Sequence, residues 1–376
     1  MKEPSSISPF VLSPELVEGS KDERTPLKSI LLIRLSAMGD IVMASLVIAG
    51  FRAEYPDSRI AWLVEEGFED LLKANPLLDE VIVLPRRTWK RLIREGRLLA
   101  FGASVAGFVK HLRRGRFDLA VDLQGLLKSA IWAVLSGAAE RIGLGSKEGS
   151  RWLMTSVVPK PSGDARIGSE YRCLISVLGM DARPFPMDVA LDDADEHFAE
   201  AFRVEKGLEG GYIVITPFTT RPQKHWVETR WNDLAHDLSA NLGYRTVILG
   251  GRGDREAAER IASRGGGELI DMTGQTTLRQ AAALIKHAAL LIGVDTGLTH
   301  VGIAFHIPTI AIFGSTCPYT DTTRENAVVL YKKLACSPCR RNPTCNGAFD
   351  CMKSVAVEEV SREAARLIRI KTPECH

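Results

Sequence analysis

Short runs of aliphatic and β-branched residues alternate with amphipathic stretches along most of this chain, and this rhythm constrains the fold more than any other feature. The first half contains the runs SILLIRL, RIAWLV, EVIVL and DLAVDL, and the second half contains YIVITP, RTVILGG, ELID, LLIGV and TIAIF. Apolar runs separated by helical patterns are typical of parallel strands that are covered on both faces. The sequence therefore predicts an α/β protein with doubly wound parallel sheets.

The stretches between these runs have the apolar spacing of helices. We predict helices over residues 41–55, 66–73, 105–114, 126–136, 228–241, 254–263, 277–287, 296–305 and 355–370. Each predicted helix except the last links two predicted strands or follows one directly, which is the order expected of two successive Rossmann-like domains.

The rhythm lapses once, around residues 183–211, where RPFPMD, the acidic run LDDADEH and the glycine-rich KGLEGG occur. Such a lapse predicts a domain boundary. We expect a first Rossmann-like domain, a second one and a terminal helix that packs back on the first, preceded by a poorly ordered extension. The ranges for the extension, the two domains and the helix are 1–27, 28–195, 205–352 and 355–371. Because open α/β sheets bind ligands beyond the carboxyl ends of their strands, we expect a site formed by loops of both domains.

Length and composition exclude several classes of protein. The 376 residues, 45% hydrophobic and 25% charged, are enough for two globular domains and exclude disorder throughout. A formal net charge of +2 gives no overall attraction to nucleic acid, so an anionic partner must meet a local patch. No stretch reaches the roughly 18 apolar residues of a membrane span and no signal peptide is visible, so we expect a cytoplasmic protein.

The cysteines and one acidic run raise the question of a metal. Seven cysteines are an odd number and do not suggest a secreted disulfide framework. Four of them lie near the end of the chain: Cys336, Cys339, Cys345 and Cys351. One CxxC pair followed by two longer spacings favours free thiols, with zinc as the alternative. The run DDAD at 192–195 has the spacing of a metal-binding motif, but it precedes a helix, which favours capping. We expect no metal ligands.

The first predicted strand ends in the turn LSAMGD, which opens a helix. Gly39 would let the backbone approach a ligand closely, and Asp40 would lie at the carboxyl end of the sheet, where a general base could act. The alternative is that Asp40 caps the start of the helix. Position alone leaves both interpretations open.

Basic residues gather around Trp89 in the segment RRTWKR. Guanidinium groups beside an aromatic ring suit carboxylates or phosphates on a sugar. A solvated helix face is the alternative, and for Arg94 and Arg97 we prefer it. The segment DLQGLLK follows a strand of the same half and adds two polar side chains. The candidates for binding an anionic acceptor are therefore Arg86, Arg87, Lys90, Gln124 and Lys128.

Two loops of the second half could meet a nucleotide. In TPFTTRPQKHW, hydroxyl groups and Lys224 precede a helix, an arrangement that suits a diphosphate, although an ordinary connection with a solvated lysine is the alternative. In LGGRGDREAAER, two glycines are followed by Glu256 at a level where an acidic residue commonly binds ribose. Simple helix capping would also explain that second loop.

The segment VDTGLTH, after the run LLIGV, concentrates a carboxylate, a hydroxyl, a glycine and an imidazole at the carboxyl end of a strand. We interpret Asp295 and His300 as ligand-binding residues. A capped helix with a histidine in the core is the alternative.

Taken together, these segments resemble one family, the lipopolysaccharide heptosyltransferases of glycosyltransferase family nine, which are inverting enzymes with the two-domain GT-B fold. The matching segments are LIRLSAMGD, WLVEEGF, DLQGLLKSA, TTRPQKHW, LGGRGDREAAER, GVDTGLTH with the following GIAF and IFGST, and CSPC with the later cysteines. They extend from about residue 28 to residue 352 and occur in the same order as in the family.

The resemblance implies transfer of L-glycero-D-manno-heptose from ADP-heptose to the Kdo of the lipopolysaccharide inner core. The acceptor would be a lipid A-Kdo glycolipid at the cytoplasmic face of the inner membrane, with no required cofactor and no nucleic acid partner. The resemblance implies that Asp40 is the catalytic base and that Lys224 assists catalysis. The implied donor-binding residues are Thr219, Thr220, Lys224, Glu256, Thr276, Asp295, Thr296, Gly297, Leu298 and His300. Thr276 stands where first-heptose enzymes have a methionine near the adenine.

The resemblance also bears on the subtype. WLVEEGF and RRTWK are most similar to heptosyltransferase I, whereas the cysteine-rich segment is more similar to heptosyltransferase II. Arg86, Arg87 and Lys90 would suit the carboxylates of Kdo, which favours the first. Heptosyltransferase II, another core-sugar transferase of the family, and a non-catalytic nucleotide-binding protein are the alternatives.

Overall fold

The computed structural model describes residues 27–181, 186–263, 268–339 and 342–371. The predicted extension, apart from residue 27, lies outside this part of the chain. The chain divides into two compact units. Unit 1 comprises residues 1–36, 44–164 and 168–186, and unit 2 comprises residues 37–43, 165–167 and 187–376.

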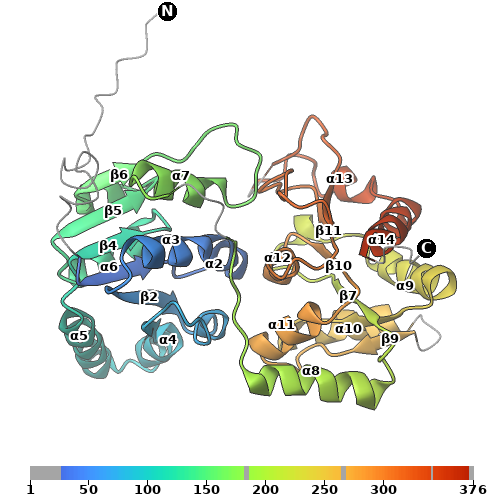
Figure 1. Cartoon of the computed structure of the whole chain (residues 1–376), viewed down its shortest axis with the longest axis horizontal. Helices are drawn as coiled ribbons and strands as arrows, with labels where there is room; N and C mark the ends of the chain where they lie inside the picture. The colour runs from blue at the N-terminus through green and yellow to red at the C-terminus, as the bar shows by residue number, and fades with distance from the viewer. Residues whose placement is uncertain (1–26, 182–185, 264–267, 340–341, 372–376) are drawn as a thin grey trace, which may run out of the picture. The chain divides into compact units, whose positions relative to one another are not determined.

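Unit 1 contains a parallel sheet with helices between its strands (Figure 1). Its strands are β1 (Ser29–Ile33), β2 (Arg59–Glu65), β3 (Glu80–Leu84), β4 (Leu119–Asp122), β5 (Glu140–Leu144) and β6 (Ser156–Val158), in the order β3-β2-β1-β4-β5-β6. The connections contain α3 (Leu46–Glu54), α4 (Arg86–Arg94), α5 (Leu98–Arg114), α6 (Leu127–Leu135) and the short 3-10 helices η2 (Glu69–Leu71) and η3 (Ser150–Leu153), and α7 (Ser169–Val177) follows β6. Between β1 and α3 lies α2 (Met38–Ala44), most of which groups with unit 2. The residues of β1 are fully apolar after Ser29 and buried, as a strand covered on both faces requires.

Unit 2 contains a second parallel sheet in the order β12-β11-β10-β7-β8-β9. Its strands are β7 (Tyr212–Thr216), β8 (Arg245–Ile248), β9 (Leu269–Asp271), β10 (Leu290–Val294), β11 (Thr309–Phe313) and β12 (Ala327–Tyr331). Its helices are α8 (Asp193–Lys206), α9 (Glu228–Leu242), α10 (Arg255–Ala262), α11 (Leu278–Lys286), α12 (Gly297–Ala304), α13 (Asp350–Lys353) and α14 (Val357–Lys371), with the 3-10 helices η4 (Pro222–Lys224) and η5 (Arg252–Asp254). The predicted fold class, two doubly wound parallel sheets, is confirmed.

Each sheet has one topological switch point, where the strand order reverses. In unit 1 it lies between β1 and β4, which pair in parallel, and in unit 2 it lies between β7 and β10, which also pair in parallel. The loops that follow such a strand pair diverge and leave room for a ligand at the carboxyl end of the sheet. Several candidate residues follow these strands, among them Asp40 after β1, Lys128 after β4, Lys224 after β7 and Asp295 after β10.

Three predicted helices in the first half differ from the structure. The helix predicted over 105–114 is α5, which begins earlier, at Leu98. The helix predicted over 66–73 is only the short η2, because Gly67 has φ +102° and the chain turns again at Asn75, whose side-chain oxygen accepts the N–H of Leu77. The helix predicted over 41–55 is two helices, α2 and α3, with Ser45 between them.

The terminal helix α14 packs in the core of unit 2, so the prediction that it packs back on the first domain is wrong. Val360, Ala364 and Leu367 are fully buried in the same apolar cluster as Trp231. The Nε1 of Trp226 also donates to the carbonyl of Val355, at 2.9 Å. An amphipathic helix needs an apolar surface, and the face of α9 provides it.

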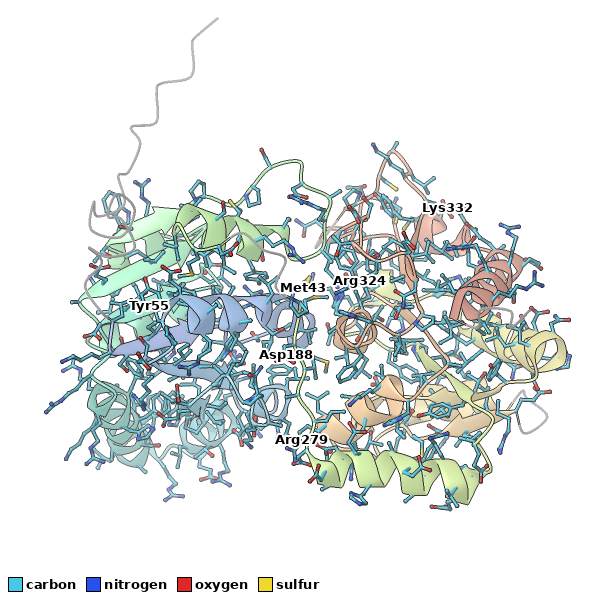
Figure 2. All side chains as sticks on the ribbon, in the orientation of Figure 1. Met43, Tyr55, Asp188, Arg279, Arg324 and Lys332 are labelled. Carbon is cyan, nitrogen blue, oxygen red and sulfur yellow. The ribbon has the colours of Figure 1, made fainter. Side chains whose placement is uncertain are left out.

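The acidic run at 192–195 caps α8, as predicted. The carboxylate of Asp192 accepts the N–H groups of Ala194 and Asp195, each at 3.1 Å. Arg279 of α11 lies beside the start of α8 (Figure 2) and pairs with Asp192 at 2.7 Å and with Asp195 at 3.2 Å. The run is therefore a structural junction between α8 and α11 within unit 2.

None of the helices in the described ranges is long and apolar enough to cross a bilayer.

Candidate functional site

A buried group of charged side chains in unit 2 surrounds Asp295, which directly follows β10 at the switch point. The Nζ of Lys224 lies 2.7 Å from one carboxylate oxygen of Asp295, and the Nε2 of His300 lies 3.5 Å from the other. The hydroxyl of Thr316 donates to Asp295 as well. Lys224 follows β7 and His300 lies on α12, so the loops of adjacent strands bring the three predicted residues together.

This group is largely buried. The side chain of Asp295 is 11% exposed, that of Lys224 is 18% exposed and that of His300 is 3% exposed. Burial alone would raise the pKa of Asp295, but hydrogen bonding and charge from His300 and Lys224 outweigh it and hold this pKa well below its usual range. Asp295 is therefore a fixed negative charge that orients a lysine and a histidine.

Tyr319 supports His300 from the other side. Its hydroxyl lies 2.7 Å from Nδ1 of His300, and its ring packs edge-on against Phe313 with 5.2 Å between ring centroids. Burial, together with the charge of Asp295, raises the pKa of Tyr319 well above its ordinary value, so the hydroxyl keeps its proton. The imidazole is held at both nitrogens, which fixes its orientation.

The backbone beneath this group is close-packed around Gly293 of β10. The hydroxyl of Thr299 donates to the carbonyl of Val294 at 2.7 Å and lies 3.2 Å from the hydroxyl of Thr216. A Cβ added to Gly293 would collide with both hydroxyl groups. A glycine at this position therefore lets α12 approach the strands closely enough to place His300.

The loop that carries Lys224 is fixed at both ends. The Nε2 of His225 lies 2.9 Å from the carbonyl of Thr219, and Trp226 is bound to Val355 as described above. Thr219 is partly buried, whereas Thr220 is exposed in the same loop. The predicted hydroxyl groups thus belong to one braced loop with Lys224.

The remaining predicted donor residues are spread along the same edge of the sheet. Thr296, Gly297 and Leu298 form the start of α12, with Thr296 at the N-cap. Glu256 is exposed in the first turn of α10, after β8, and Thr276 lies between β9 and α11. Because β8 and β9 lie successively further from β10, the structure places these two residues away from the Asp295 group.

Asp40 lies in a segment, Ala37–Met43, that groups with unit 2 although it follows β1. Its Oδ2 accepts the N–H of Ala37 at 3.3 Å, so the capping contact considered from the sequence is present. In the same segment, a Cβ added to Gly39 would collide with the imidazole of His300. A glycine at position 39 is therefore required for this approach, and Asp40 remains partly exposed.

In unit 1 the predicted basic residues meet at Glu65, a residue that the sequence analysis did not single out. The Nη1 of Arg86 binds both oxygens of Glu65, at 2.7 and 2.8 Å, and the Nζ of Lys128 lies 3.5 Å away. Lys128 also donates to the hydroxyl of Ser36 at 3.0 Å. Two cations around one carboxylate leave a net positive charge at the ends of β2 and β4. The adjacent acids in WLVEEGF were the available signal for Glu65.

Other predicted acceptor residues have different surroundings. Arg87 is exposed, and its N–H donates to the carboxylate of Glu66 at 3.2 Å; Lys90 is also exposed. Gln124 is buried, and its Oε1 accepts the N–H of Leu35 at 3.0 Å. Gln124 therefore braces the segment after β1 through its side-chain oxygen.

Asp122 organises the loop that carries Gln124. Its carboxylate accepts the N–H groups of Gln124 and Gly125 at 3.0 and 3.1 Å and the hydroxyl of Ser129 at 3.0 Å. Burial raises the pKa of Asp122 although these hydrogen bonds oppose the shift. Gly125 has φ +67°, and a Cβ there would collide with the carbonyl of Leu144, so only glycine fits this turn without strain.

The cysteine group near the end of the described chain consists of free thiols. Burial raises the pKa of Cys339 and of Cys351, and the neighbouring cysteines raise both further. Within the described ranges, no three His, Cys, Asp or Glu side chains are arranged to hold a metal ion.

The chain is similar to several characterised proteins. The model of glycosyltransferase family 9 (heptosyltransferase) matches residues 105–349. Lipopolysaccharide heptosyltransferase 1 of Pseudomonas aeruginosa is 26% identical over 321 residues, covering 84% of this chain and 87% of that protein. The glycosyl transferase family 9 structure from Veillonella parvula has a TM-score of 0.75 at 22% identity and covers 92% and 98% of the two chains. ADP-heptose lipopolysaccharide heptosyltransferase II of Escherichia coli has a TM-score of 0.70 at 22% identity and covers 91% and 99%.

The solved structures show the same fold, which is the GT-B arrangement of two Rossmann-like sheets. The family match extends from α5 of unit 1 across the switch-point loops of unit 2 that carry Lys224, Asp295 and His300. Because this match covers more than half of the sequence, the chain belongs to glycosyltransferase family 9 (heptosyltransferase) and is a glycosyltransferase.

Proposed function

We propose that this enzyme transfers a heptose from ADP-heptose to the Kdo of the lipopolysaccharide inner core, with inversion at the anomeric carbon. The observation that carries this proposal is the buried group of Lys224, Asp295 and His300 at the switch point of unit 2. The names of the relatives described above, which include lipopolysaccharide heptosyltransferases 1 and II, support the donor and the acceptor class.

The donor diphosphate would bind beside Lys224 and the start of α12. The ammonium group and the N–H groups of Gly297 and Leu298 would supply positive potential for the phosphates and for the negative charge that develops on the leaving ADP. The carboxylate of Asp295 would accept hydrogen bonds from heptose hydroxyls, and the imidazole of His300 would donate hydrogen bonds to them. Thr219 and Thr220 would add hydroxyl groups from the Lys224 loop, while Glu256 and Thr276 would meet the nucleoside.

Asp40 would remove the proton from the acceptor hydroxyl as that oxygen attacks the anomeric carbon. The new carbon–oxygen bond forms on the face opposite to the departing ADP, which explains inversion. The partial exposure of Asp40 and the approach of Gly39 to His300 support this role. The capping contact to Ala37 occupies one carboxylate oxygen and keeps the side chain in a fixed orientation.

The acceptor would bind to the basic residues of unit 1, with Arg86, Arg87, Lys90 and Lys128 contacting the carboxylates of Kdo. Gln124 would act indirectly by holding the segment after β1. We further propose that residues 28–195 act as the acceptor domain and residues 205–352 as the donor domain. The acceptor glycolipid would place the enzyme at the cytoplasmic face of the inner membrane.

The decisive experiment measures heptose transfer from ADP-heptose to Kdo-lipid A, with and without a first heptose already attached. We expect transfer to the unheptosylated acceptor, as for heptosyltransferase I. Transfer only to the acceptor that already carries a heptose would instead identify heptosyltransferase II. Binding of ADP, UDP and GDP measured by calorimetry should favour ADP, and failure with both acceptors despite ADP binding would refute the proposed acceptor.

A further inference from the structure

Exposed large apolar side chains are concentrated in unit 1. Among the described residues, seven of the eight such side chains belong to unit 1, and Val204 of α8 is the exception. Three of the seven lie where α4 ends and α5 begins: Ile93 is 51% exposed, Leu98 is 65% exposed and Leu99 is 93% exposed. We call residues 91–99 the α4–α5 corner. Three such side chains within seven residues are more typical of a binding surface than apolar residues exposed singly.

The backbone of the α4–α5 corner is ordered. The N–H of Gly96 donates to the carbonyl of Ile93 at 3.1 Å, and the N–H of Arg97 donates to the carbonyl of Leu92 at 2.9 Å. Beneath the corner, the buried ring of Trp89 packs edge-on against the aromatic rings of α5, which lies beside α4 (Figure 1). The apolar side chains are therefore held outward by a rigid support.

The charge around these apolar side chains is mostly positive. The α4–α5 corner contains three arginines, which are Arg91, Arg94 and Arg97, and one acid, Glu95. The side chains of Arg91 and Arg97 are 66% and 62% exposed, and their contacts with Glu95 are long, at 4.0 and 3.4 Å. Exposed pairs of this kind hold the guanidinium groups weakly. The arginines are thus available to an anionic surface.

Val204 shows that exposure alone does not define such a surface. It is 58% exposed on α8, where the nearby acids Glu200, Glu205 and Glu209 outnumber the cations Arg203 and Lys206. A local excess of acids gives no net attraction to an anionic surface. Val204 therefore serves as a matched control.

We propose that the α4–α5 corner docks on an anionic lipid bilayer, with Leu98 and Leu99 inserted below the headgroups and the three arginines bound to lipid phosphates. Apolar side chains ringed by cations are what an interfacial membrane contact requires. A second copy of the corner would bring like charges together, and a nucleic acid would find no exposed aromatic ring there to stack on.

The proposal rests on the proposed function because the glycolipid acceptor lies in a membrane. Helix α4 connects the two features: Arg86, which binds Glu65, is at its start, and the corner is at its end. A nine-residue helix is on the order of 13 Å long. Docking at the corner would therefore hold the acceptor-binding cations a short distance from the lipid surface.

The test is sedimentation of the full chain with vesicles that contain phosphatidylglycerol, compared with vesicles of phosphatidylcholine alone. We expect the wild type to bind the anionic vesicles. The double variant Leu98→Ser/Leu99→Ser should lose about tenfold or more of this binding. Each substitution among Arg91→Gln, Arg94→Gln and Arg97→Gln should lower binding about fivefold, and only at low salt. Val204→Ser should bind as the wild type does.

Two readouts separate this proposal from the proposed function. Leu98→Ser/Leu99→Ser should bind ADP and use a soluble deacylated Kdo acceptor as the wild type does, but it should be slower on acceptor embedded in vesicles. Vesicle binding without any heptose transfer would refute the proposed function and leave lipid docking supported. The docking proposal is overturned if the folded double variant, with an unchanged melting temperature, binds anionic vesicles like the wild type. It is also overturned if Ile131→Ser of α6 abolishes binding while the double variant does not.

Discussion

The two switch points follow the same strand order, yet they place charged side chains in different surroundings. After β7 and β10, Asp295 and Lys224 are 11% and 18% exposed and share a contact of 2.7 Å. In unit 1, Arg86 after β3 and Lys128 after β4 are 46% and 41% exposed and share the carboxylate of Glu65 at the end of β2. One sheet therefore ends in a buried, fixed network and the other in a hydrated, cationic cluster.

This difference suits two ligands of different kinds. Buried charges keep their orientation and interact strongly, as binding a diphosphate with a fixed geometry requires. Exposed cations each contribute little, but together they attract an acid and tolerate variation in its position. Substitutions in unit 2 should therefore have larger effects than equivalent substitutions in unit 1.

The largest expected effect is at Asp40, which follows a strand of unit 1 but groups with unit 2. Asp40→Asn keeps an oxygen that can accept the N–H of Ala37 but removes the base, so turnover should fall about 10²–10⁴-fold. ADP affinity and the melting temperature should stay the same. Full activity of this variant, measured as ADP release, would show that Asp40 only caps α2.

The next effect compares a cation from each unit. Lys224→Ala removes the cation proposed to contact the diphosphate, an interaction worth roughly 1.5–3 kcal/mol, so the ADP dissociation constant should rise about 10–150-fold. Arg86→Ala should leave ADP binding unchanged and raise only the KM for the acceptor, by up to about fivefold. Calorimetry with ADP and steady-state kinetics measure the two effects. Lys224→Arg should retain part of the ADP affinity. If Lys224→Ala and the wild type bind ADP equally well, the expected difference between the two units is contradicted.

Acid stability should also distinguish the buried network. The folded-state pKa of Asp295 lies below its unfolded value, so this group stabilises the fold above about pH 4 and loses that contribution as the pH falls further. Asp295→Asn should reduce the free energy of unfolding near neutral pH by roughly 1–3 kcal/mol, with a smaller deficit in acid. Urea unfolding at a series of pH values tests this. A deficit that does not shrink in acid would mean that the charge of Asp295 is not what stabilises the fold.

The smallest effect is expected at Tyr319. Tyr319→Phe keeps the ring packing on Phe313 but removes the hydroxyl group bound to His300, a hydrogen bond worth roughly 0.5–1.5 kcal/mol. If the orientation of His300 matters for the donor, affinity for ADP-heptose should weaken a few-fold while ADP affinity changes less. Equal affinities for both ligands in the variant and the wild type would show that the hydroxyl serves only the fold.

Much of this architecture could be predicted from the sequence because buried parallel strands are continuous apolar runs. SILLIRL and LLIGV are read as strands without any tertiary information, and the loops after them carry Asp40 and Asp295. The same reasoning missed β5, β6 and β12. Strand β5 begins with the charged pair in ERIGL, and β6 has only three residues, so neither forms a long apolar run.

The parts that could not be predicted depend on contacts between distant residues. Glu65 is one of two adjacent acids, and only its pairing with Arg86 and Lys128 distinguishes it. Tyr319 reaches His300 because β11 brings the chain back beside β10, which no local spacing records. For α14, the apolar stripe predicts that the helix packs, but not on which unit.

The hydrogen bond from Trp226 to the carbonyl of Val355 links the Lys224 loop to a residue that lies more than a hundred positions further along the chain. Arg230 of α9 donates to the same carbonyl, at 2.6 Å. During synthesis on the ribosome, the strands β7 to β11 emerge well before this carbonyl exists. The loop proposed to bind the nucleotide therefore gains this support only after residue 355 has been added, so a shorter nascent chain should bind ADP poorly.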